Sequence, residues 1–556
     1  MSCGSRGLSS RSKTTMKHAA TCPSLVLALL FTTACGGASP DAEIASLMPK
    51  DCVAVVRIAS VDQLVKNMRH AAIAVGEDPK SVDADTLLKQ LEGVGGKTAL
   101  IDRSRPIAIA VSMPGDTPSP VLLIPATDAK AYAASLPPMG APPVVSGGYV
   151  VLALGAKYEK AHNPQALVNN LPSGVLAIRA DAEQLVTMLG SEISANLRTV
   201  EAQMARELTS SGSGLDGKAM AEAFAGVARS VLGAAKTLEL SLDYRDGQLD
   251  AFAALTVKPG SELDGWGAEP VDLKSLTGRL SGKGSFEVLM AADWGKLWPR
   301  LAAIAQPALD IYPPQMRELL RPYFADFEQL YRALGPIVAA EGDVFGSKGM
   351  SFLMHLAPPD ATALQRQFEA ILAHESLAKM GISSGPAKAV EADGASIRDY
   401  EMKIDLDKFA TLSGLPAERD STATALHAMF GGGNLLMRLA NKGGRSVLAI
   451  GAQPNLAATL ASLDGKGGNW SKSVQAVLAR LGDCNPLVVE RIDFAAMMSG
   501  MSQVAAAVGG PALPPVPAGQ SADFVIAAGI HKNEWRGQLS IDVTGFAKVV
   551  KAMMPR

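Results

Sequence analysis

A serine and a lysine at positions 376 and 379 are the first residues whose types and spacing could do chemistry. Ser376-Leu-Ala-Lys379 has the Ser-x-x-Lys spacing, in which a lysine can assist a serine nucleophile. The same residues continue the apolar periodicity of a helix expected over residues 361–373. Serine and lysine on one turn of such a helix usually form its solvated face. We therefore interpret Ser376 and Lys379 as structural.

Two other motifs resemble functional sites only in outline. Residues 91–98 end in Gly-Gly-Lys-Thr, but Leu91 stands where a phosphate-binding loop has its first glycine, so we expect Gly95-Gly96 to end a helix instead. Asp405 and Asp407 alternate along one short segment. We expect them to be the polar face and the cap of a strand–helix unit rather than a general acid–base pair.

Histidine and cysteine are too scattered to form a metal or redox centre by local spacing. The chain has seven histidines without a His-x-x-x-His spacing, and five cysteines without a Cys-x-x-Cys spacing. We predict no metal ligand, no cofactor and no catalytic residue. On these grounds we expect a protein that is not an enzyme, although a site assembled from distant residues would leave no such pattern.

The first 35 residues indicate where the protein is sent. Residues 1–34 contain four basic residues and no acid, and their apolar run is too short to span a bilayer, as in a secretory signal peptide. The residues from Leu29 to Cys35 resemble the lipobox of bacterial lipoproteins, with Thr32 in place of the usual leucine. The resemblance implies cleavage before Cys35 and acylation of its thiol. Whether Met1 or Met16 starts the chain stays open.

We therefore expect a signal peptide at 1–34, a lipidated tether at 35–47, and an exported protein whose partner is the membrane that holds its lipid. Gly36 is not the aspartate linked to inner-membrane retention in lipoproteins, which favours the periplasmic face of the outer membrane. Loss of the signal lowers Lys plus Arg from 52 to 48 against 54 Asp plus Glu, a net charge of -6. This balance gives no electrostatic reason to expect a nucleic acid partner.

Besides Cys35, the mature chain keeps Cys52 and Cys484. In an oxidising compartment such a pair can form a disulfide. Each cysteine stands at the start of an expected strand, eight or nine residues before a helix cap, which suggests equivalent strands and motivates a bond between them. Two buried free thiols are the alternative that we leave open.

One local pattern organises the body of the chain: a β-branched run, then a serine or aspartate, then an apolar residue four positions later. Such a run predicts a strand followed by a capped helix. The expected caps are Ser60, Asp128, Asp181, Asp293, Asp360 and Asp493. Hairpins are expected between these units, at residues 107–124, 238–257 and 435–450. Residues 191–209 and 216–235 have helical spacing and predict a helical hairpin.

Antiparallel hairpins mixed with helices indicate an α+β fold. Residues 147–156 resemble residues 443–452, and each segment is followed by another strand–cap–helix unit. We therefore expect two similar halves, 48–268 and 269–556, each an antiparallel-rich sheet with helices packed on one face. A chance likeness between two β-rich segments is the alternative.

Three classes of function are compatible with these patterns. The first is a non-enzymatic envelope protein that binds or scaffolds other envelope components, and the body resembles uncharacterised exported lipoproteins, which implies no activity. The second is a carrier of a hydrophobic ligand, because the chain has 22 methionines and few aromatic residues. The third is a hydrolase whose active site is assembled from distant residues.

Overall fold

The computed structural model describes the chain from Ala42 to Met553, with several short gaps. The residues within that range that are not described are 92–95, 115–116, 139–140, 156, 162–170, 211–216, 268–269, 277, 296, 300–301, 303–308, 310–313, 347–348, 413–428, 508–515 and 517–518.

The central feature of the described residues is one antiparallel sheet of 19 strands. The strands are β1 (Cys52–Ile58), β2 (Ile107–Ser112), β3 (Ser119–Pro125), β4 (Val144–Ser146), β5 (Tyr149–Ala153), β6 (Leu176–Asp181), β7 (Ala235–Arg245), β8 (Gln248–Val257), β9 (Phe286–Ala291), β10 (Ile337–Asp343), β11 (Ser351–Leu356), β12 (Ile382–Ser384), β13 (Lys388–Ala392), β14 (Ala395–Ile404), β15 (Asn434–Lys442), β16 (Arg445–Gly451), β17 (Asn485–Asp493), β18 (Asp523–His531) and β19 (Glu534–Asp542).

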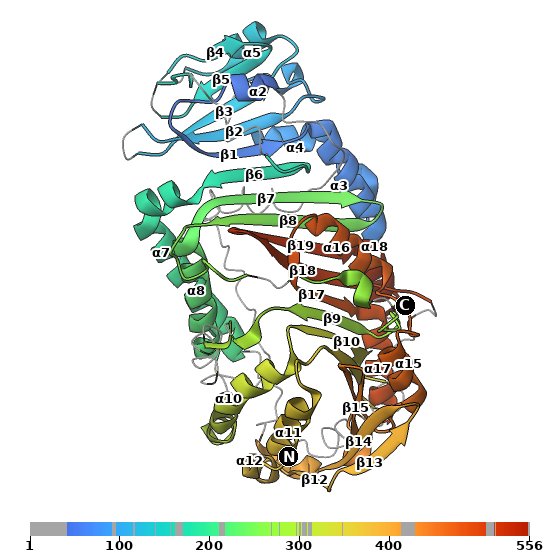
Figure 1. The fold of residues 1–556 in the computed structure, drawn as a ribbon. Helices are drawn as coiled ribbons and strands as arrows, with labels where there is room; N and C mark the ends of the chain where they lie inside the picture. The colour runs from blue at the N-terminus through green and yellow to red at the C-terminus, as the bar shows by residue number, and fades with distance from the viewer. Residues whose placement is uncertain are drawn as a thin grey trace, which may run out of the picture.

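From top to bottom of Figure 1 the sheet begins at β4 and ends at β12 and β13, which both pair with the outer side of β14. The first half of the chain forms the order β5-β3-β2-β1-β6-β7-β8, and the second half repeats it as β16-β11-β10-β9-β17-β18-β19. The two last strands, β8 and β19, pair with each other and join the halves. The prediction of an α+β fold with two similar halves is therefore confirmed.

The expected strand–cap–helix units form because the cap side chain accepts hydrogen bonds from free N–H groups of the first helical turn. Ser60 Oγ accepts from the N–H of Gln63 at 3.0 Å, and Asp128 Oδ1 accepts from the N–H of Ala131 at 2.9 Å. Asp493 caps its helix in the same way. The predicted hairpins also form, and the β7–β8 turn has positive φ at both central residues, Asp246 and Gly247.

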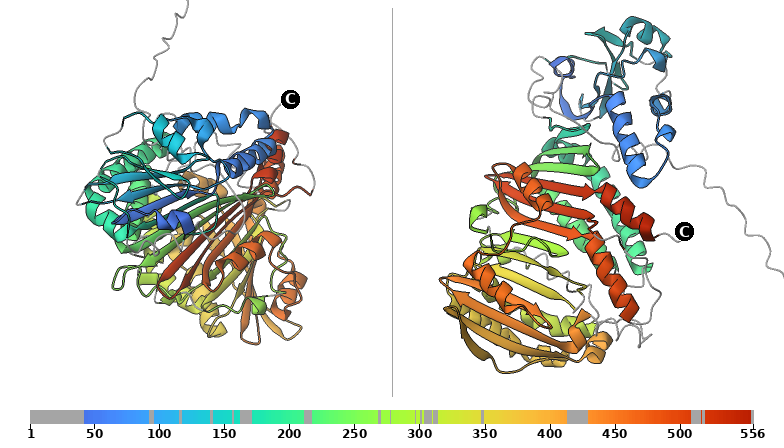
Figure 2. Two further views of the ribbon diagram at one scale, coloured as in Figure 1. Left: turned by 90° about the horizontal axis from the view of Figure 1, so that it is seen from above. Right: turned by 90° about the vertical axis from the view of Figure 1, so that its right-hand side faces the viewer.

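Helices cover both faces of the sheet, as the right-hand view of Figure 2 shows, and not the one face expected, because successive side chains on both faces of many strands are apolar and need cover. The main helices are α2 (Ala42–Ser46), α3 (Val61–Val75), α4 (Ala84–Leu91), α5 (Ala129–Ser135), α7 (Ala182–Ser210), α8 (Gly217–Ala234), α10 (Pro314–Leu334), α11 (Ala361–Leu372), α12 (Glu375–Lys379), α13 (Leu406–Leu412), α15 (Leu456–Asp464), α16 (Lys472–Leu481), α17 (Phe494–Ala507) and α18 (Val543–Met553). The predicted helical hairpin is α7 with α8, and α7 begins nine residues earlier than expected.

The alternation of side chains along each strand assigns these helices to faces. On one face α3, α4, α5, α10 and α11 cover the strands in apolar clusters. On the opposite face α2 covers the first half, and α15 and α16 cover the second. On this second face the described helices leave β7 and β8 uncovered, whereas α16 reaches β19, where Arg536 donates to the carbonyl oxygen of Leu481.

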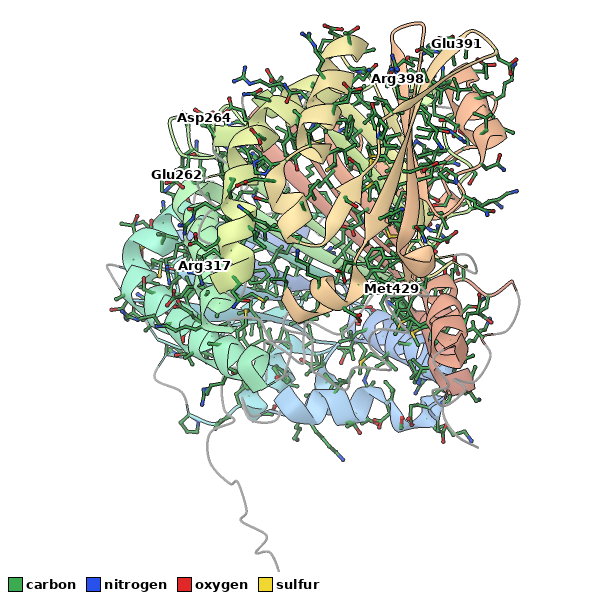
Figure 3. The ribbon with its side chains drawn as sticks, turned by 90° about the horizontal axis from the view of Figure 1, so that it is seen from below. Glu262, Asp264, Arg317, Glu391, Arg398 and Met429 are labelled. Carbon is green, nitrogen blue, oxygen red and sulfur yellow. The ribbon has the colours of Figure 1, made fainter. Side chains whose placement is uncertain are left out.

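The segment between the halves is part of the second core rather than a free linker. Leu276 and Leu280 lie in the cluster beneath α16, and Trp266 packs against Trp535 of β19 with ring centroids 5.6 Å apart. Glu262 and Asp264 of this segment are labelled in Figure 3. The halves are therefore joined by packing as well as by the sheet.

A buried ionic network fixes β17 against β9, β18 and the loop before β9. Arg491 donates to the carbonyl oxygen of Gly284 at 3.0 Å, to Glu287 at 3.2 Å and to Asp523 at 2.9 Å. Glu287 is fully shielded from solvent and also accepts from the N–H of Ser471 at 3.1 Å. Each charge is thereby compensated in a low-dielectric setting.

We expect Arg491→Met to lower the free energy of unfolding by about 3–5 kcal/mol, because it leaves the Glu287 carboxylate buried beside uncompensated charge. Urea denaturation followed by circular dichroism measures this change. The control is Arg332→Ala, which removes an ion pair with Glu328 whose side chains are 60% and 39% exposed. We expect less than about 0.5 kcal/mol from it. Equal losses in the two variants would contradict this account of the network.

A buried histidine makes stability depend on pH. His355 of β11 is 4% exposed, and burial lowers its pKa from 6.5 to about 4, with Arg279 and Arg445 adding to the effect. The unfolded chain takes up the proton near pH 6.5, while the folded chain resists it until about pH 4. The folded state therefore loses stability as the pH falls through this window, by about 3 kcal/mol in total.

We expect His355→Gln to reduce the slope of unfolding free energy against pH between 6.5 and 4, because glutamine does not titrate. Urea denaturation at several pH values measures the slope for the parent and the variant. Identical slopes would show that His355 does not carry the effect.

Candidate functional site

In the structure, Ser376 and Lys379 of the Ser-x-x-Lys motif lie in different environments. Helix α11 ends at Leu372, and Ser376 and Lys379 belong to the separate helix α12, so the expected continuous helix is wrong. Ser376 is buried, at 3% exposure, because α12 packs its side chain inward. The Lys379 ammonium lies on the surface and pairs with Glu375 at 2.7 Å. The pair thus has structural roles, although Ser376 is not on a solvated face as expected.

A second serine motif, Gly381-Ile-Ser-Ser-Gly385, was not among the predicted sites, although it has the Gly-x-Ser-x-Gly spacing of hydrolase nucleophiles. Ser383 lies in the middle of β12 and not at a strand-to-helix turn, so the motif lacks the context that exposes a nucleophile. It lines a surface cleft of about 470 Å³ together with His374. His374 Nδ1 accepts the N–H of Ser376 at 3.2 Å, which places the proton of the neutral ring on Nε2. That nitrogen cannot then accept a proton from a serine.

The motif at Gly95-Gly96 is only partly described: helix α4 ends at Leu91, Gly95 lies outside the described residues, and Gly96 has a φ of 94°. The aspartate pair has the structural roles expected of it. Asp405 Oδ1 accepts from the N–H of Lys408 at 3.0 Å, so Asp405 is the expected cap at the start of α13. Asp407 follows inside that helix.

The predicted bond between Cys52 and Cys484 is wrong, and both thiols are free. Cys52 lies in β1 and Cys484 precedes β17, and five strands separate β1 from β17 in the sheet. Six strand spacings of about 4.8 Å amount to roughly 29 Å, whereas a disulfide needs Cα atoms within about 7 Å. Burial raises the pKa of the Cys52 thiol to about 11 and also raises that of Cys484.

Cys35, the predicted lipidation site, lies outside the described residues. Among the described residues no helix is long and apolar enough to cross a membrane. No group of three or more His, Cys, Asp or Glu side chains in that part of the chain could hold a metal ion.

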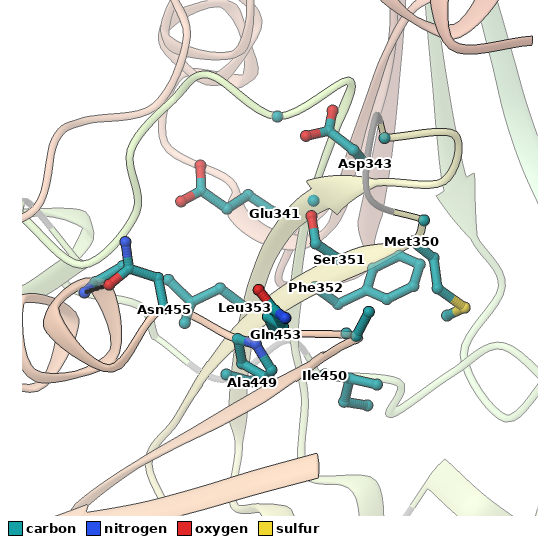
Figure 4. Close-up of a pocket in the computed structure, with 18 of the residues that line it drawn as sticks. Glu341, Asp343, Met350, Ser351, Phe352, Leu353, Ala449, Ile450, Gln453 and Asn455 are labelled. Atoms are coloured by element: carbon teal, nitrogen blue, oxygen red, sulfur yellow. Dashed lines mark hydrogen bonds between the residues drawn. The ribbon is translucent and has the colours of Figure 1, made fainter. Parts of the chain in front are cut away.

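One surface cleft, of about 430 Å³, lies over β10, β11 and β16 (Figure 4). Its two carboxylates, Glu341 and Asp343, hold the loop in front of β9. Glu341 accepts from the N–H of Ser281 at 2.6 Å and from that of Gly282 at 2.9 Å, and Asp343 accepts from the N–H of Ser285 at 2.9 Å. Both carboxylates therefore accept hydrogen bonds that hold the loop before β9 in place.

A larger cleft, of about 540 Å³, lies where the two halves meet, and we call it the central cleft. Its floor is formed by β7, β8 and β19. One wall is Pro172 and Ser173, just before β6, and the opposite wall includes Arg480 of α16. The remaining lining residues are Glu239, Ser241, Asp243, Arg245, Asp250, Phe252, Glu534, Arg536 and Gln538.

Ion pairs dominate one end of the central cleft. Arg179 pairs with Glu239 at 2.7 Å, and Arg536 pairs with both Glu534 and Asp483 at 2.7 Å. Burial raises the pKa of Glu239, whereas Arg179 acts in the opposite direction. The charges at this end are thus largely compensated within the protein.

Two carboxylates face each other at the other end. Asp243 of β7 and Asp250 of β8 are directly opposite in the ladder, where like charges destabilise a sheet. Asp250 is compensated by an ion pair with Arg480 and a hydrogen bond from Ser540 Oγ at 2.7 Å. Asp243 pairs through Oδ2 with Arg245 at 2.6 Å. Burial raises the pKa of Asp243, and the nearby Asp250 adds to that rise against the effect of Arg245.

Asp243 Oδ1 differs from Oδ2 of the same side chain, which pairs with Arg245. It is shielded from solvent and has no hydrogen-bond partner in the described part of the chain. The sequence contains no signal for this arrangement beyond the Asp-Gly turn that makes β7 and β8 neighbours, because the other walls of the cleft come from distant segments.

No family model and no curated protein matches this chain. Among solved structures, two crystal forms of TP0453 match at 9% and 7% identity with TM-scores of 0.21 and 0.23. Each match covers 51% of this chain, and 99% and 98% of the matched chain respectively. A likeness at these TM-scores carries no argument about function, which rests instead on the geometry of the clefts.

Proposed function

We propose that this protein is an exported lipoprotein that is anchored through Cys35 and binds an envelope component in its central cleft without catalysing a reaction. The observation that carries the proposal is the open stretch of sheet between the covers of the two halves, lined by charged side chains at the junction of β8 and β19. The lipobox resemblance supplies the anchor. Helix α2 begins seven residues after Cys35, so the tether is short and keeps the body near the membrane surface.

The lining of the central cleft favours binding over catalysis. The described lining residues include neither histidine nor cysteine, and the acids are paired with arginines. Arginine–carboxylate pairs present fixed donors and acceptors, which suit the recognition of a polar partner.

The two other classes of function have less support. A carrier of a hydrophobic ligand needs an apolar cavity, but the central cleft is polar, and the buried methionines Met48, Met437 and Met498 belong to packed clusters. A hydrolase needs a nucleophile within reach of a base. Ser376 is buried while the Lys379 ammonium pairs with Glu375 at the surface, and the histidine that shares a cleft with Ser383 has its Nδ1 engaged by a backbone N–H.

The anchor is tested by Cys35→Ser. We expect the variant to accumulate as uncleaved precursor and to lose incorporation of radiolabelled palmitate, because the lipid is attached to this thiol. Cys52→Ser is the matched control and should keep both cleavage and labelling, since Cys52 is a partly buried residue of β1 in the body of the protein. Undiminished labelling of the Cys35 variant would refute the anchor.

Binding in the central cleft is tested by photo-crosslinking in cells that export the protein. A photoreactive residue in place of Ser173, which is exposed on the cleft wall, should form a covalent adduct with an envelope component upon irradiation. The control position is Glu391, exposed on β13 at the far edge of the sheet and labelled in Figure 3. If no adduct forms at Ser173, or if both positions give the same adducts, the central cleft is not the binding site.

A further inference from the structure

A cleft of about 470 Å³ lies between helices α3 and α18, which are side by side at the right-hand margin of the molecule in Figure 1 and again in Figure 2, and we call it the α3–α18 cleft. Both helices are fastened to the end of the β7–β8 hairpin. The N–H of Thr544, at the start of α18, donates to the carbonyl oxygen of Gly247 at 3.2 Å. The Tyr244 hydroxyl donates to the carbonyl oxygen of His70 in α3 at 3.5 Å. The cleft is therefore a fixed part of the fold.

The wall that α3 contributes to this cleft exposes large apolar side chains. Ile73 and Val75 are 59% and 54% exposed, although the first turns of the same helix bury their apolar residues. Ala74 of α3 and Ala547 of α18 continue the apolar lining. Several exposed apolar side chains on one surface are typical of a contact with a partner or a membrane.

Two lysines give the same cleft a positive charge. Lys548 and Lys551 are three residues apart on α18, both are exposed, and neither forms an ion pair within the described part of the chain. The described lining of the cleft contains no carboxylate. By contrast, the exposed Lys379 is paired with Glu375. Apolar side chains beside uncompensated lysines match the two parts of an anionic lipid, its acyl chains and its phosphate.

We infer that the α3–α18 cleft is a membrane contact that binds anionic phospholipids. Ile73 and Val75 enter the interface of the bilayer, where their apolar surface leaves water. Lys548 and Lys551 bind the phosphate groups of the lipids beside them. Helix and cleft together thus supply both of the interactions that hold a protein on a membrane surface.

The choice of a membrane as the partner rests on the proposed function, because the anchor brings a bilayer close to the body. Helix α2 begins seven residues after Cys35, and this tether spans at most about 25 Å. The contact adds an orientation to the anchor. Since α3 covers the first face of the sheet and the central cleft lies on the second, docking through the α3–α18 cleft leaves the central cleft accessible.

The test uses residues 36–556, which contain every described element but not the cysteine that would carry the lipid, so the contact is measured apart from the anchor. Flotation measures the affinity for vesicles of phosphatidylcholine alone and of phosphatidylcholine with phosphatidylglycerol in equal parts. We expect an affinity at least about tenfold higher for the anionic vesicles, because each lysine at an anionic surface strengthens binding about fivefold. Equal affinities, or no binding to the anionic vesicles, would overturn the inference.

The double variant Lys548→Gln, Lys551→Gln should lower the affinity for the anionic vesicles at least about tenfold, because both phosphate-binding charges are lost. The matched control is Lys130→Gln, Lys472→Gln, which removes two exposed lysines from α5 and α16 and changes the net charge equally. We expect it to bind the anionic vesicles like the parent. An equal loss in the two double variants would show that net charge drives the binding, and would overturn the inference.

Ile73→Ser should lower the affinity for the anionic vesicles at least about threefold without a change of charge, because the inserted apolar surface is lost. Val390→Ser, at a position of β13 that is 41% exposed, is the control and should bind like the parent. Unchanged binding of Ile73→Ser would contradict the inferred insertion.

The two kinds of vesicle are compared on the parent chain, so the inference is tested even if a variant does not fold. Its failure is distinguishable from failure of the proposed function. Loss of vesicle binding by residues 36–556 leaves palmitate labelling at Cys35 and crosslinking at Ser173 unchanged, whereas failure of those two experiments leaves the vesicle binding unchanged.

Discussion

The pairing of β8 with β19 is the interaction on which the rest of the molecule depends. It is continuous from Gln248 opposite Asp542 to Thr256 opposite Glu534, and it turns two sheets into one. Each of these strands is the second arm of a hairpin, so the junction is supported on both sides by β7 and β18. Without it, two long strand edges would expose unpaired N–H and C=O groups.

The same pairing creates the central cleft. In the first half α2 and the segment at Pro172 cover this face up to the junction, and in the second half α16 reaches the junction, where Arg480 pairs with Asp250. Several polar side chains of this floor are nevertheless buried, among them Ser241, Asp250 and Gln538, so Asp250 is held by Arg480 and Ser540. The row of side chains that includes Asp243 and Asp250 continues in the second half into the buried network of Arg491 and Glu287, where each charge also needs a specific partner.

Local structure was predictable because its causes are local. Caps such as Ser60 and Asp128 act within one helical turn, and the Asp246-Gly247 turn fixes its own hairpin. The pairing of β8 with β19 joins residues nearly 300 positions apart and depends on which edges remain free after each half has folded. No pattern within β8 or β19 indicates which strand edges remain free. The sequence therefore predicted two halves but not how they join or where the cleft lies.

The incorrect prediction of a disulfide between Cys52 and Cys484 also arises because local patterns do not specify strand order. Both cysteines precede a strand–cap–helix unit, and the two units look alike locally. The strand order shows that β1 is equivalent to β9, whereas β17 is equivalent to β6. The sequence comparison therefore matched β1 with β17, although the strand equivalent to β1 is β9. Local likeness identified the type of unit correctly but could not give its place in the sheet, and a disulfide depends on that place.

The repeat also explains how a nearly symmetric scaffold carries an asymmetric site. Phe252 and Gln538 are each the fifth residue of their strand and lie opposite each other, so they mark the centre of the β8–β19 pairing. Asp250 and Arg536 are each the third residue, on either side of that centre, and they carry opposite charges. Equivalent backbone positions thus hold an acid in one half and a base in the other. A ligand that distinguishes the two ends of the cleft by charge can bind in only one direction, whereas identical halves would accept it in two.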